Sequence, residues 1–414
     1  MAATADEQVE NPFKESGAKK LARKNKKQRT TKKKKKIRIR ALVPGLSCFK
    51  KPTLEIENDD GNSEGDEELR SSPSHLIVTV NGFLGSVDDW KYAVEQFLKQ
   101  YPKDVLVHCS KRNSATLSFD GVDVMGERLA DEVISVIKRY PDLRKISFLG
   151  HSLGGLISRY AVASLYQRNC LSRHPCNDGE DVKHQSSKEA PEENSKKEVA
   201  ALEPINFITF ATPHLGLGGS KQVPLFGGNH SLEKIARQTS GLLGRTGKHL
   251  FLTDNDDGKP PLLLQMTNDY GDLPFISALK SFRRRVLYAN ARYDYIVGWS
   301  TSSLRRRKEL PQRQSFSRNN RYRHIVNVET AKHGSSEGVY PLDSAVDGWK
   351  RFDTNAMMEA MLSRLTKLEW ERVDVEFTGT RQRFLAHNTI QVASFRLHSQ
   401  GADVIQHMID NFLL

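Results

Sequence analysis

The sequence predicts an α/β fold in which helices cover both faces of a mostly parallel sheet. Short runs rich in β-branched residues alternate along the chain with helical patterns of about 12 to 20 residues. Such alternation is typical of βαβ units, and the runs are nearly continuous apolar stretches, as in strands buried on both faces. With 414 residues, the chain is long enough for one large domain of this class or two smaller ones.

The first two expected strands are each followed by a helix. Residues 75–83 (HLIVTVNGF) are a β-branched run that ends in Asn-Gly. Residues 88–101 follow with apolar residues at helical spacing, behind an aspartate that can cap the helix. Residues 104–110 (DVLVHCS) form the second expected strand, and residues 120–140 continue the alternation with a long amphipathic helix.

The later strands follow the same pattern. Residues 145–150 (KISFLG) predict the third strand, and the helix after it covers residues 153–167. Apolar runs predict further strands over residues 205–213 (INFITFATP) and 284–291 (RRVLYANA). Strict alternation of apolar and polar residues predicts another strand over residues 372–377 (RVDVEF).

Insertions interrupt this order. Residues 168–200 are polar and almost free of large apolar residues, so we expect a disordered excursion at the surface. Residues 214–280 contain apolar side chains that must pack, either in a helical cap-like lid over an active site or in an ordinary helical layer.

Residues 302–323, with three consecutive arginines, predict a basic surface loop. Residues 401–414 carry apolar residues at helical spacing, which predicts a docked final helix.

Positive charge is concentrated near the start of the chain. Residues 14–40 hold 15 lysines or arginines and one acid, a net charge of +14, whereas the whole chain carries +13. The remainder is therefore nearly neutral, and charge gives no reason to expect nucleic-acid binding by the folded body. An acidic patch follows at residues 57–72. We interpret residues 1–73 as a disordered basic arm and acidic linker, and residues 74–414 as the folded domain.

The simplest interpretation of the basic arm is a solvated tail. The alternatives are peripheral contact with anionic membrane, to which each basic residue adds about 1 kcal/mol, or a nuclear-localisation-like address. An organelle transit peptide fits less well, because the arm contains acids. No apolar run approaches the roughly 20 residues of a membrane span, so we expect a cytoplasmic or membrane-peripheral protein. The four cysteines lack metal-ligand spacing and are expected to be reduced thiols.

A serine lies where the third expected strand changes to the helix after it. The stretch FLGHSLGGLISRY contains a Gly-x-Ser-x-Gly pentapeptide with Ser152 at its centre. A sharp turn there exposes the hydroxyl at a helix N-terminus, where the dipole and free N–H groups favour negative charge. Gly150 and Gly154 are the positions at which a β-carbon would crowd this turn. The setting predicts a nucleophile, and an ordinary glycine turn is the alternative.

A glycine-rich turn at the end of the first expected strand predicts an oxyanion hole. Asn81, Gly82 and Phe83 should lie near the serine, because the two strands are expected to be close in the sheet. The backbone N–H of Phe83 can then point at the same spot as that of Leu153. Each such donor stabilises a transition-state oxyanion by about 3 kcal/mol. A plain Asn-Gly turn is the alternative.

The acid and the base of a hydrolytic triad should follow the serine, each just beyond a later strand. Asp294 lies three residues past the strand expected at residues 284–291 and is the predicted acid. His387 lies between the alternating strand and the final helix and is the predicted base. The less well placed candidates are Asp343, Asp347, His324, His333 and His407.

Several motifs together resemble those of one enzyme family. They are VNGFLGSVDDW, DGVDVMGERLADEV, FLGHSLGGLISRYA, TFATPHLG, GRTGKHLFLTD, YANARYDYIVGW, AHNTIQV and GADVIQHMIDNF. On these motifs, the chain resembles the lipase-like serine esterases of the α/β-hydrolase superfamily, and in detail their plant members. The resemblance covers residues 74–414 apart from the polar insertion. One departure is Asn81-Gly82, where many esterases of this type have His-Gly.

The resemblance implies the α/β-hydrolase fold and a serine hydrolase that cleaves carboxylic esters, with acyl lipids as expected substrates. Ser152 would be the nucleophile, His387 the base and Asp294 its orienting acid, and neither a metal nor an organic cofactor is required. An acyltransferase or a thioesterase would use the same triad, because the pocket selects the acceptor. A noncatalytic hydrolase-fold scaffold, tethered by its basic tail, is the alternative from another class.

Overall fold

The structure of the chain is a computed structural model. It describes residues 72–173, 198–218, 223–224, 230–255, 258–317, 320–331 and 353–414. The basic arm, the acidic linker and most of the polar insertion lie outside these ranges, as do Asp343, Asp347 and His333. What the sequence predicts for those parts stays a prediction.

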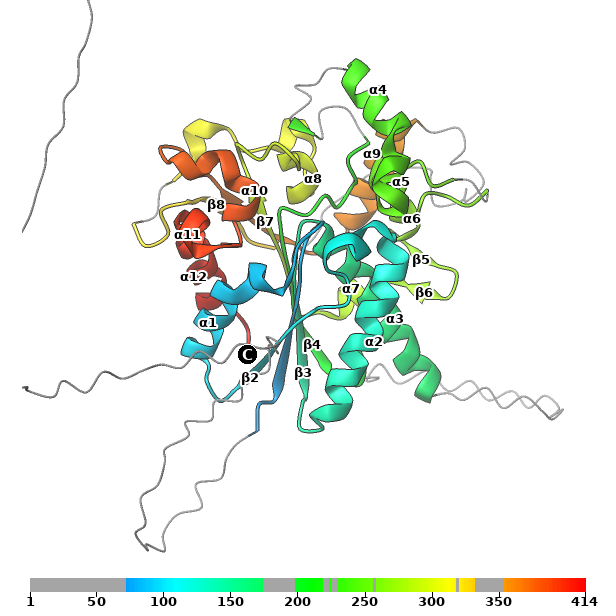
Figure 1. The fold of residues 1–414 in the computed structure, drawn as a ribbon, viewed down its shortest axis with the longest axis vertical. Helices are drawn as coiled ribbons and strands as arrows, with labels where there is room; N and C mark the ends of the chain where they lie inside the picture. The colour runs from blue at the N-terminus through cyan, green and yellow to red at the C-terminus, as the bar shows by residue number, and fades with distance from the viewer. Residues whose placement is uncertain are drawn as a thin grey trace, which may run out of the picture. The chain divides into compact units, whose positions relative to one another are not determined.

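A seven-stranded sheet lies at the centre of the described chain (Figure 1). Its strands are, in spatial order, β2 (Val105–Cys109), β1 (His75–Val80), β3 (Lys145–His151), β4 (Glu203–Phe210), β7 (Arg284–Asn290), β9 (Glu371–Val375) and β8 (Ile325–Glu329). Neighbouring strands pair in parallel, except that β8 runs antiparallel to β9 at the edge. The predicted strands therefore form one mostly parallel sheet, and their bounds agree with the predictions to within a few residues.

Helices cover both faces of this sheet, as predicted (Figure 1). On one side lie α1 (Lys91–Gln100), which follows the 3₁₀ helix η1 (Val87–Trp90), and the final helix α12 (Ala402–Asp410). On the other side lie α2 (Val122–Arg139), α3 (Leu153–Arg173) and α7 (Phe275–Ser281). The 3₁₀ helix η2 (Ala115–Phe119) precedes α2. In the described chain, no helix combines the length and apolar content that a bilayer span requires.

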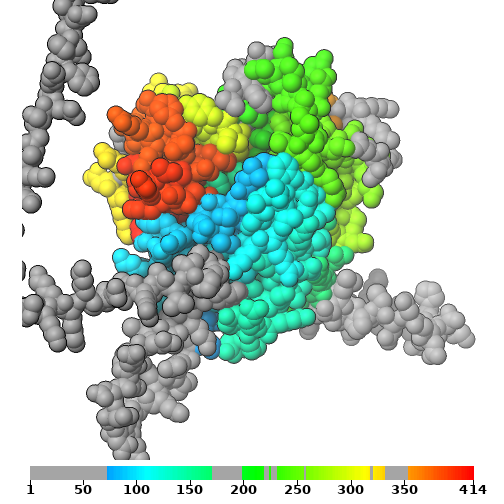
Figure 2. Space-filling view, in the orientation of Figure 1, coloured from blue at the N-terminus to red at the C-terminus, as the bar shows by residue number. Residues whose placement is uncertain are grey.

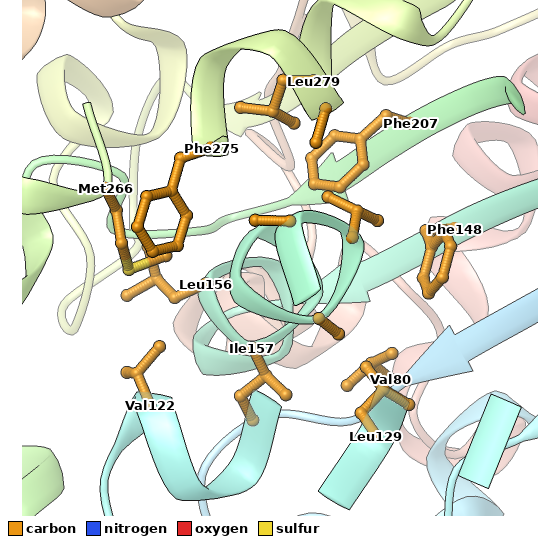
Figure 3. Close-up of a cluster of buried hydrophobic side chains, with 14 of the residues drawn as sticks. Val80, Val122, Leu129, Phe148, Leu156, Ile157, Phe207, Met266, Phe275 and Leu279 are labelled. Atoms are coloured by element: carbon orange, nitrogen blue, oxygen red, sulfur yellow. The ribbon is translucent and has the colours of Figure 1, made fainter. Parts of the chain in front are cut away.

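The side chains of β1 alternate between two apolar cores. Val80 belongs to the core under α2 and α3, where it packs near Leu129 (Figure 3). Ile77 points the other way, into the core that contains Phe97 of α1 and Ile405 of α12. Successive side chains of a strand point to opposite faces, so an apolar run without alternation is what a strand buried on both sides requires.

The insertion after β4 is built from several short elements. It contains α4 (His230–Gln238), the 3₁₀ helix η4 (Ser240–Leu243), α5 (Gly244–Phe251), α6 (Leu262–Gln265), and the short hairpin of β5 (Asp269–Tyr270) and β6 (Leu273–Pro274). Its later part is a helical layer, because Leu263 and Met266 are buried in the core. Its earlier part exposes Ile235 and Leu242. Movement of this part as a lid stays a prediction.

Four further helices belong to the C-terminal part of the chain. They are α8 (Trp299–Ser303), α9 (Thr354–Leu365), α10 (Ala386–Thr389) and α11 (Phe395–His398). The sequence patterns did not predict α9 or β8, and α3 continues past residue 167 into the stretch expected to be disordered. The expected basic surface loop is wrong for Arg305, which is 4% exposed and lies 2.8 Å from the carboxylate of Asp374. Asp374 is fully buried, and a buried carboxylate requires an ionic or hydrogen-bonded partner.

Candidate active site

Ser152 occupies a tight turn between β3 and α3. Its φ of 52° lies in the left-handed region, which is uncommon for any residue other than glycine. The turn is held by the N–H of Ser152, which donates to the carbonyl oxygen of Phe210 over 2.8 Å. A strained turn of this kind lifts the hydroxyl above the end of the sheet and places it at the start of a helix.

Two glycines make this turn sterically feasible. A β-carbon on Gly150 would lie 2.6 Å from the α-carbon of Gly155. A β-carbon on Gly154 would lie 2.2 Å from the carbonyl oxygen of Val80. Both distances are far below van der Waals contact with backbone that cannot move aside. The helix therefore starts directly against β3 and β1, which is the close approach that the sequence predicted.

His387 bridges Ser152 and Asp294. Its Nε2 lies 3.0 Å from Oγ of Ser152, and its Nδ1 lies 2.9 Å from Oδ2 of Asp294. Asp294 lies in the turn after β7, and His387 lies in α10 after β9. The parallel sheet brings these residues together because the carboxyl ends of its strands share one edge. The three residues predicted as a triad are thus in hydrogen-bond contact.

The carboxylate of Asp294 is buried and receives several hydrogen bonds. The N–H groups of Ile296 and Val297 donate to Oδ1 over 3.0 and 2.9 Å, and Nδ2 of Asn290 donates to Oδ2 over 3.0 Å. Burial acts to raise the pKa of Asp294, but the charge of His387 and these hydrogen bonds outweigh it and hold the pKa below its usual value. The carboxylate can therefore stay ionised beside the imidazole.

His151, the residue before the serine, was not identified from the sequence. Its Nε2 lies 2.7 Å from the main-chain carbonyl oxygen of His387. Burial, reinforced by the nearby charge of His387, lowers the pKa of His151 to about 3. The ring is therefore neutral at ordinary pH, and Nε2 must carry the proton that this hydrogen bond requires. Its position inside the pentapeptide was the available signal, but the pattern does not say where its side chain points.

The loop after β1 passes directly against the serine. A β-carbon on Gly82 would lie 3.0 Å from Cβ of Ser152, so only a small residue allows this approach. Phe83 follows in the loop, and its ring packs on Phe119 with a centroid distance of 4.7 Å. Leu153 is the first residue of α3, where the helix itself offers its N–H no carbonyl partner. The two predicted oxyanion donors therefore lie on the segments that adjoin Ser152.

The other candidate histidines have different neighbours. Nδ1 of His324 lies 2.9 Å from Asp403, and Nδ1 of His407 lies 2.8 Å from the hydroxyl of Tyr288. Neither pairing involves Ser152. Within the described ranges, no group of three or more His, Cys, Asp or Glu side chains is arranged to hold a metal ion.

Comparison with known families adds an independent observation. The family described as "Putative serine esterase (DUF676)" matches residues 70–304, which is more than half of the chain. The chain belongs to this serine esterase family. The matched region includes Ser152 and Asp294, whereas His387 lies beyond it. Family membership, the strand order and the turn between β3 and α3 together confirm the predicted α/β-hydrolase fold.

Two curated relatives of the chain are fungal proteins. The chain is 33% identical over 235 residues to "Putative lipase ROG1" of Saccharomyces cerevisiae, which covers 56% of this chain and 28% of the relative. It is 27% identical over 246 residues to "Putative lipase C4A8.10" of Schizosaccharomyces pombe, which covers 57% of this chain and 27% of the relative. The chain thus spans less than a third of the length of these relatives.

Solved structures also show similarity to this chain. Mature Bacillus licheniformis lipase BlEst2 aligns with 56% of this chain and 70% of its own, at 18% identity and a TM-score of 0.31. An extracellular alpha/beta-hydrolase from a Paenibacillus species aligns with 77% of this chain and 98% of its own, at 10% identity and a TM-score of 0.31.

Proposed function

We propose that this serine esterase family member hydrolyses carboxylic esters, with Ser152 as nucleophile, His387 as general base and Asp294 as the orienting acid. The observation that carries the proposal is the position of the His387 imidazole, 3.0 Å from the serine hydroxyl and 2.9 Å from the buried carboxylate. A hydroxyl at its ordinary pKa is a weak nucleophile, and a base within hydrogen-bond reach activates it.

The first half of the reaction forms an acyl-enzyme. Nε2 of His387 accepts the proton of Ser152 while Oγ attacks the ester carbonyl carbon, and the carbonyl oxygen becomes an oxyanion. In the proposal, the N–H groups of Phe83 and Leu153 donate to that oxyanion. The bond to the leaving alcohol then breaks, and the imidazolium gives its proton to the alcohol oxygen. Asp294 stabilises the imidazolium throughout without accepting its proton.

The second half of the reaction restores the enzyme. Water enters in place of the alcohol and gives a proton to Nε2 of His387 as its oxygen attacks the acyl carbon. The tetrahedral intermediate collapses, the bond from the acyl group to Oγ breaks, and His387 returns the proton to Ser152. The product is a free carboxylic acid. Besides the ester, these steps consume one water molecule.

Acyl lipids are the proposed substrates. The relatives in yeast carry lipase names, and the sequence motifs resemble lipase-like esterases of plants. Membership of a plant-type subgroup and contact of the basic arm with anionic membrane stay predictions of the sequence. Comparing the lipids of cells that express wild type with those that express Ser152→Ala would identify the substrate. The accumulating lipid should contain an acyl ester, and identical profiles would contradict the proposed substrate class.

Hydrolysis of p-nitrophenyl butyrate by the purified full chain tests the reaction. Ser152→Ala should lower kcat/KM on the order of a thousandfold or more, since removal of a triad member leaves only binding and oxyanion stabilisation. The matched control is Ser135→Ala, on the exposed side of α2, which should leave kcat/KM unchanged. A fluorophosphonate should label wild type and the control but not Ser152→Ala. Full turnover by Ser152→Ala would refute the assignment.

A further inference from the structure

The segments that carry Asp294 and His387 expose a group of large apolar side chains. Each side chain is between 38% and 58% exposed, and the six residues are Tyr295, Ile296, Phe384, Leu385, Phe395 and Leu397. We call these six residues the apolar face. Scattered exposed apolar residues are ordinary on protein surfaces, but a contiguous group with polar residues around it marks an interaction site.

The segments that carry the apolar face contact one another, and the ring of Phe395 also stacks on Tyr92 of α1 with a centroid distance of 5.1 Å. The guanidinium of Arg383 lies 5.3 Å from the ring centroid of Tyr293, which connects the 3₁₀ helix η9 (Arg381–Leu385) to the turn after β7. Nε2 of Gln382 lies 3.1 Å from Oγ of Ser399, which places η9 beside the end of α11. In the space-filling view, the orange C-terminal segment lies next to the yellow segment around residue 300 (Figure 2).

The segment that carries most of the apolar face is basic, and its acidic neighbour from another element is Asp89 of η1, whose charge acts on His398. Between Glu376 and Asp403, the sequence contains Arg381, Arg383 and Arg396 and no acid. Both flanking acids are already paired, Glu376 with arginines and Asp403 with a histidine. Across the described ranges, none of the three arginines of this segment forms an ion pair with a carboxylate. A surface of this composition attracts an anionic partner and offers it apolar groups to bury.

We propose that the apolar face docks on the surface of an anionic phospholipid bilayer and presents a membrane-borne ester to Ser152. The aromatic and aliphatic side chains would enter the boundary between headgroups and acyl chains, while the arginines stay at the phosphate level. The presentation of substrate rests on the proposed function, whereas the docking does not. Phe384 and Leu385 precede His387 by three and two positions in the sequence. Docking of these two side chains would therefore hold His387 close to the bilayer surface.

Vesicle binding by the full chain tests the docking. The probe is phosphatidylcholine vesicles with and without phosphatidylserine. Phe384→Ser combined with Leu397→Ser should lower the partition coefficient about a hundredfold, roughly tenfold for each side chain withdrawn from the interface. The matched control is Leu414→Ser, which is 40% exposed and follows Leu413, whose carbonyl contacts Asn206 near the amino end of β4. The control should bind as wild type does, and thermal unfolding should show that all variants are folded.

A local measurement separates the apolar face from the basic arm. Hydrogen exchange of residues 381–398 should slow when phosphatidylserine vesicles are added to wild type. Unchanged exchange there, or equal vesicle binding by the double variant and wild type, would overturn the docking proposal and assign binding to the arm.

Ser152→Ala distinguishes this inference from the proposed function. We expect it to bind vesicles as wild type does, because the apolar face is intact. If vesicles bind through the face while no Ser152-dependent ester hydrolysis is found, the docking stands and the proposed function fails. If Ser152-dependent hydrolysis of p-nitrophenyl butyrate is found without binding through the face, the docking fails and the proposed function stands.

Discussion

Nε2 of His151 donates a hydrogen bond to the main-chain carbonyl oxygen of His387 over 2.7 Å. His151 directly precedes Ser152, so the turn that carries the proposed nucleophile also holds the backbone of the proposed base. The ring centroids of His151 and His387 lie 4.8 Å apart, and His151 is 3% exposed. We expect His151 to position His387 and to take no part in proton transfer.

His151→Ala should lower kcat for p-nitrophenyl butyrate about tenfold and leave KM nearly unchanged. The hydrogen bond itself contributes only about 1 kcal/mol, but a displaced base costs more because the reacting groups must be aligned. His151→Gln should recover part of the rate, since its amide nitrogen can reach the same carbonyl. The measurement is kcat and KM over a range of pH. A purely structural role would leave kcat as in wild type at temperatures where the variant is folded.

Asp294→Asn should lower kcat on the order of 10⁴-fold, because an amide does not stabilise the imidazolium and favours the wrong tautomer of His387. The chain offers a matched control in Asp403, whose carboxylate lies 2.9 Å from Nδ1 of His324. Asp403→Asn should keep kcat within about twofold of wild type. Steady-state kinetics of both variants test this contrast, and equal losses would show that the effect is general destabilisation.

Acid should destabilise the folded state through three buried histidines. Burial lowers the pKa of His75 to about 3, of His151 to about 3 and of His407 to about 4. In the unfolded chain these groups bind protons near pH 6.5. Their neutral forms therefore contribute stability that is fully present above about pH 6.5 and is lost as the pH falls toward the folded values. Each should contribute a slope of up to about 1.4 kcal/mol per pH unit.

Urea unfolding between about pH 7 and pH 5 measures that slope. His75→Gln should flatten it, because the proton that His75 binds on unfolding is then lost. This residue pairs with Ser147 over 2.8 Å and has no contact with the triad, so kcat serves as the control. A pH dependence identical to that of wild type would show that His75 does not titrate in this range.

Gly154→Ala should destabilise the protein by about 3 kcal/mol or more, because the added carbon would meet the carbonyl oxygen of Val80 at 2.2 Å. Gly241→Ala is the matched control, since nothing lies within 4 Å of a β-carbon built there. The control should change the free energy of unfolding by less than about 0.5 kcal/mol. Chemical denaturation measures both values, and similar values would contradict the close packing of α3 on β1.

Arg305→Ala should cost about 3 to 5 kcal/mol, because it leaves the buried carboxylate of Asp374 without its cationic partner. Trp299 and Asn327 still donate hydrogen bonds to Asp374, but they carry no charge. The neighbouring Arg306→Ala is the control, since its ion pairs are partly exposed to solvent and should contribute less than about 1 kcal/mol. In thermal unfolding, Arg305→Ala should lower the melting temperature more than Arg306→Ala does.

The elements of the fold that the sequence predicts are those that produce a recognisable pattern among neighbouring residues. Buried parallel strands appear as apolar runs, and the turn at Ser152 appears as glycines between a strand and a helix. The edge strand β8 was missed because it follows a basic stretch, so its few apolar residues stand out poorly. Arg305 was placed at the surface because three consecutive arginines suggest a solvated loop, and its partner Asp374 is remote in the sequence.

The sequence by itself determined the order of strands and helices, the glycine turn around Ser152 and the expected positions of an acid and a histidine after later strands. These features depend on the spacing of a few neighbouring residues. Only the tertiary structure decided which histidine contacts Ser152, because His387 lies 235 positions away and the sheet must bring the two together. The tertiary structure likewise decided that the His151 side chain points at His387 and that apolar residues gather beside the triad, since both depend on contacts between distant segments.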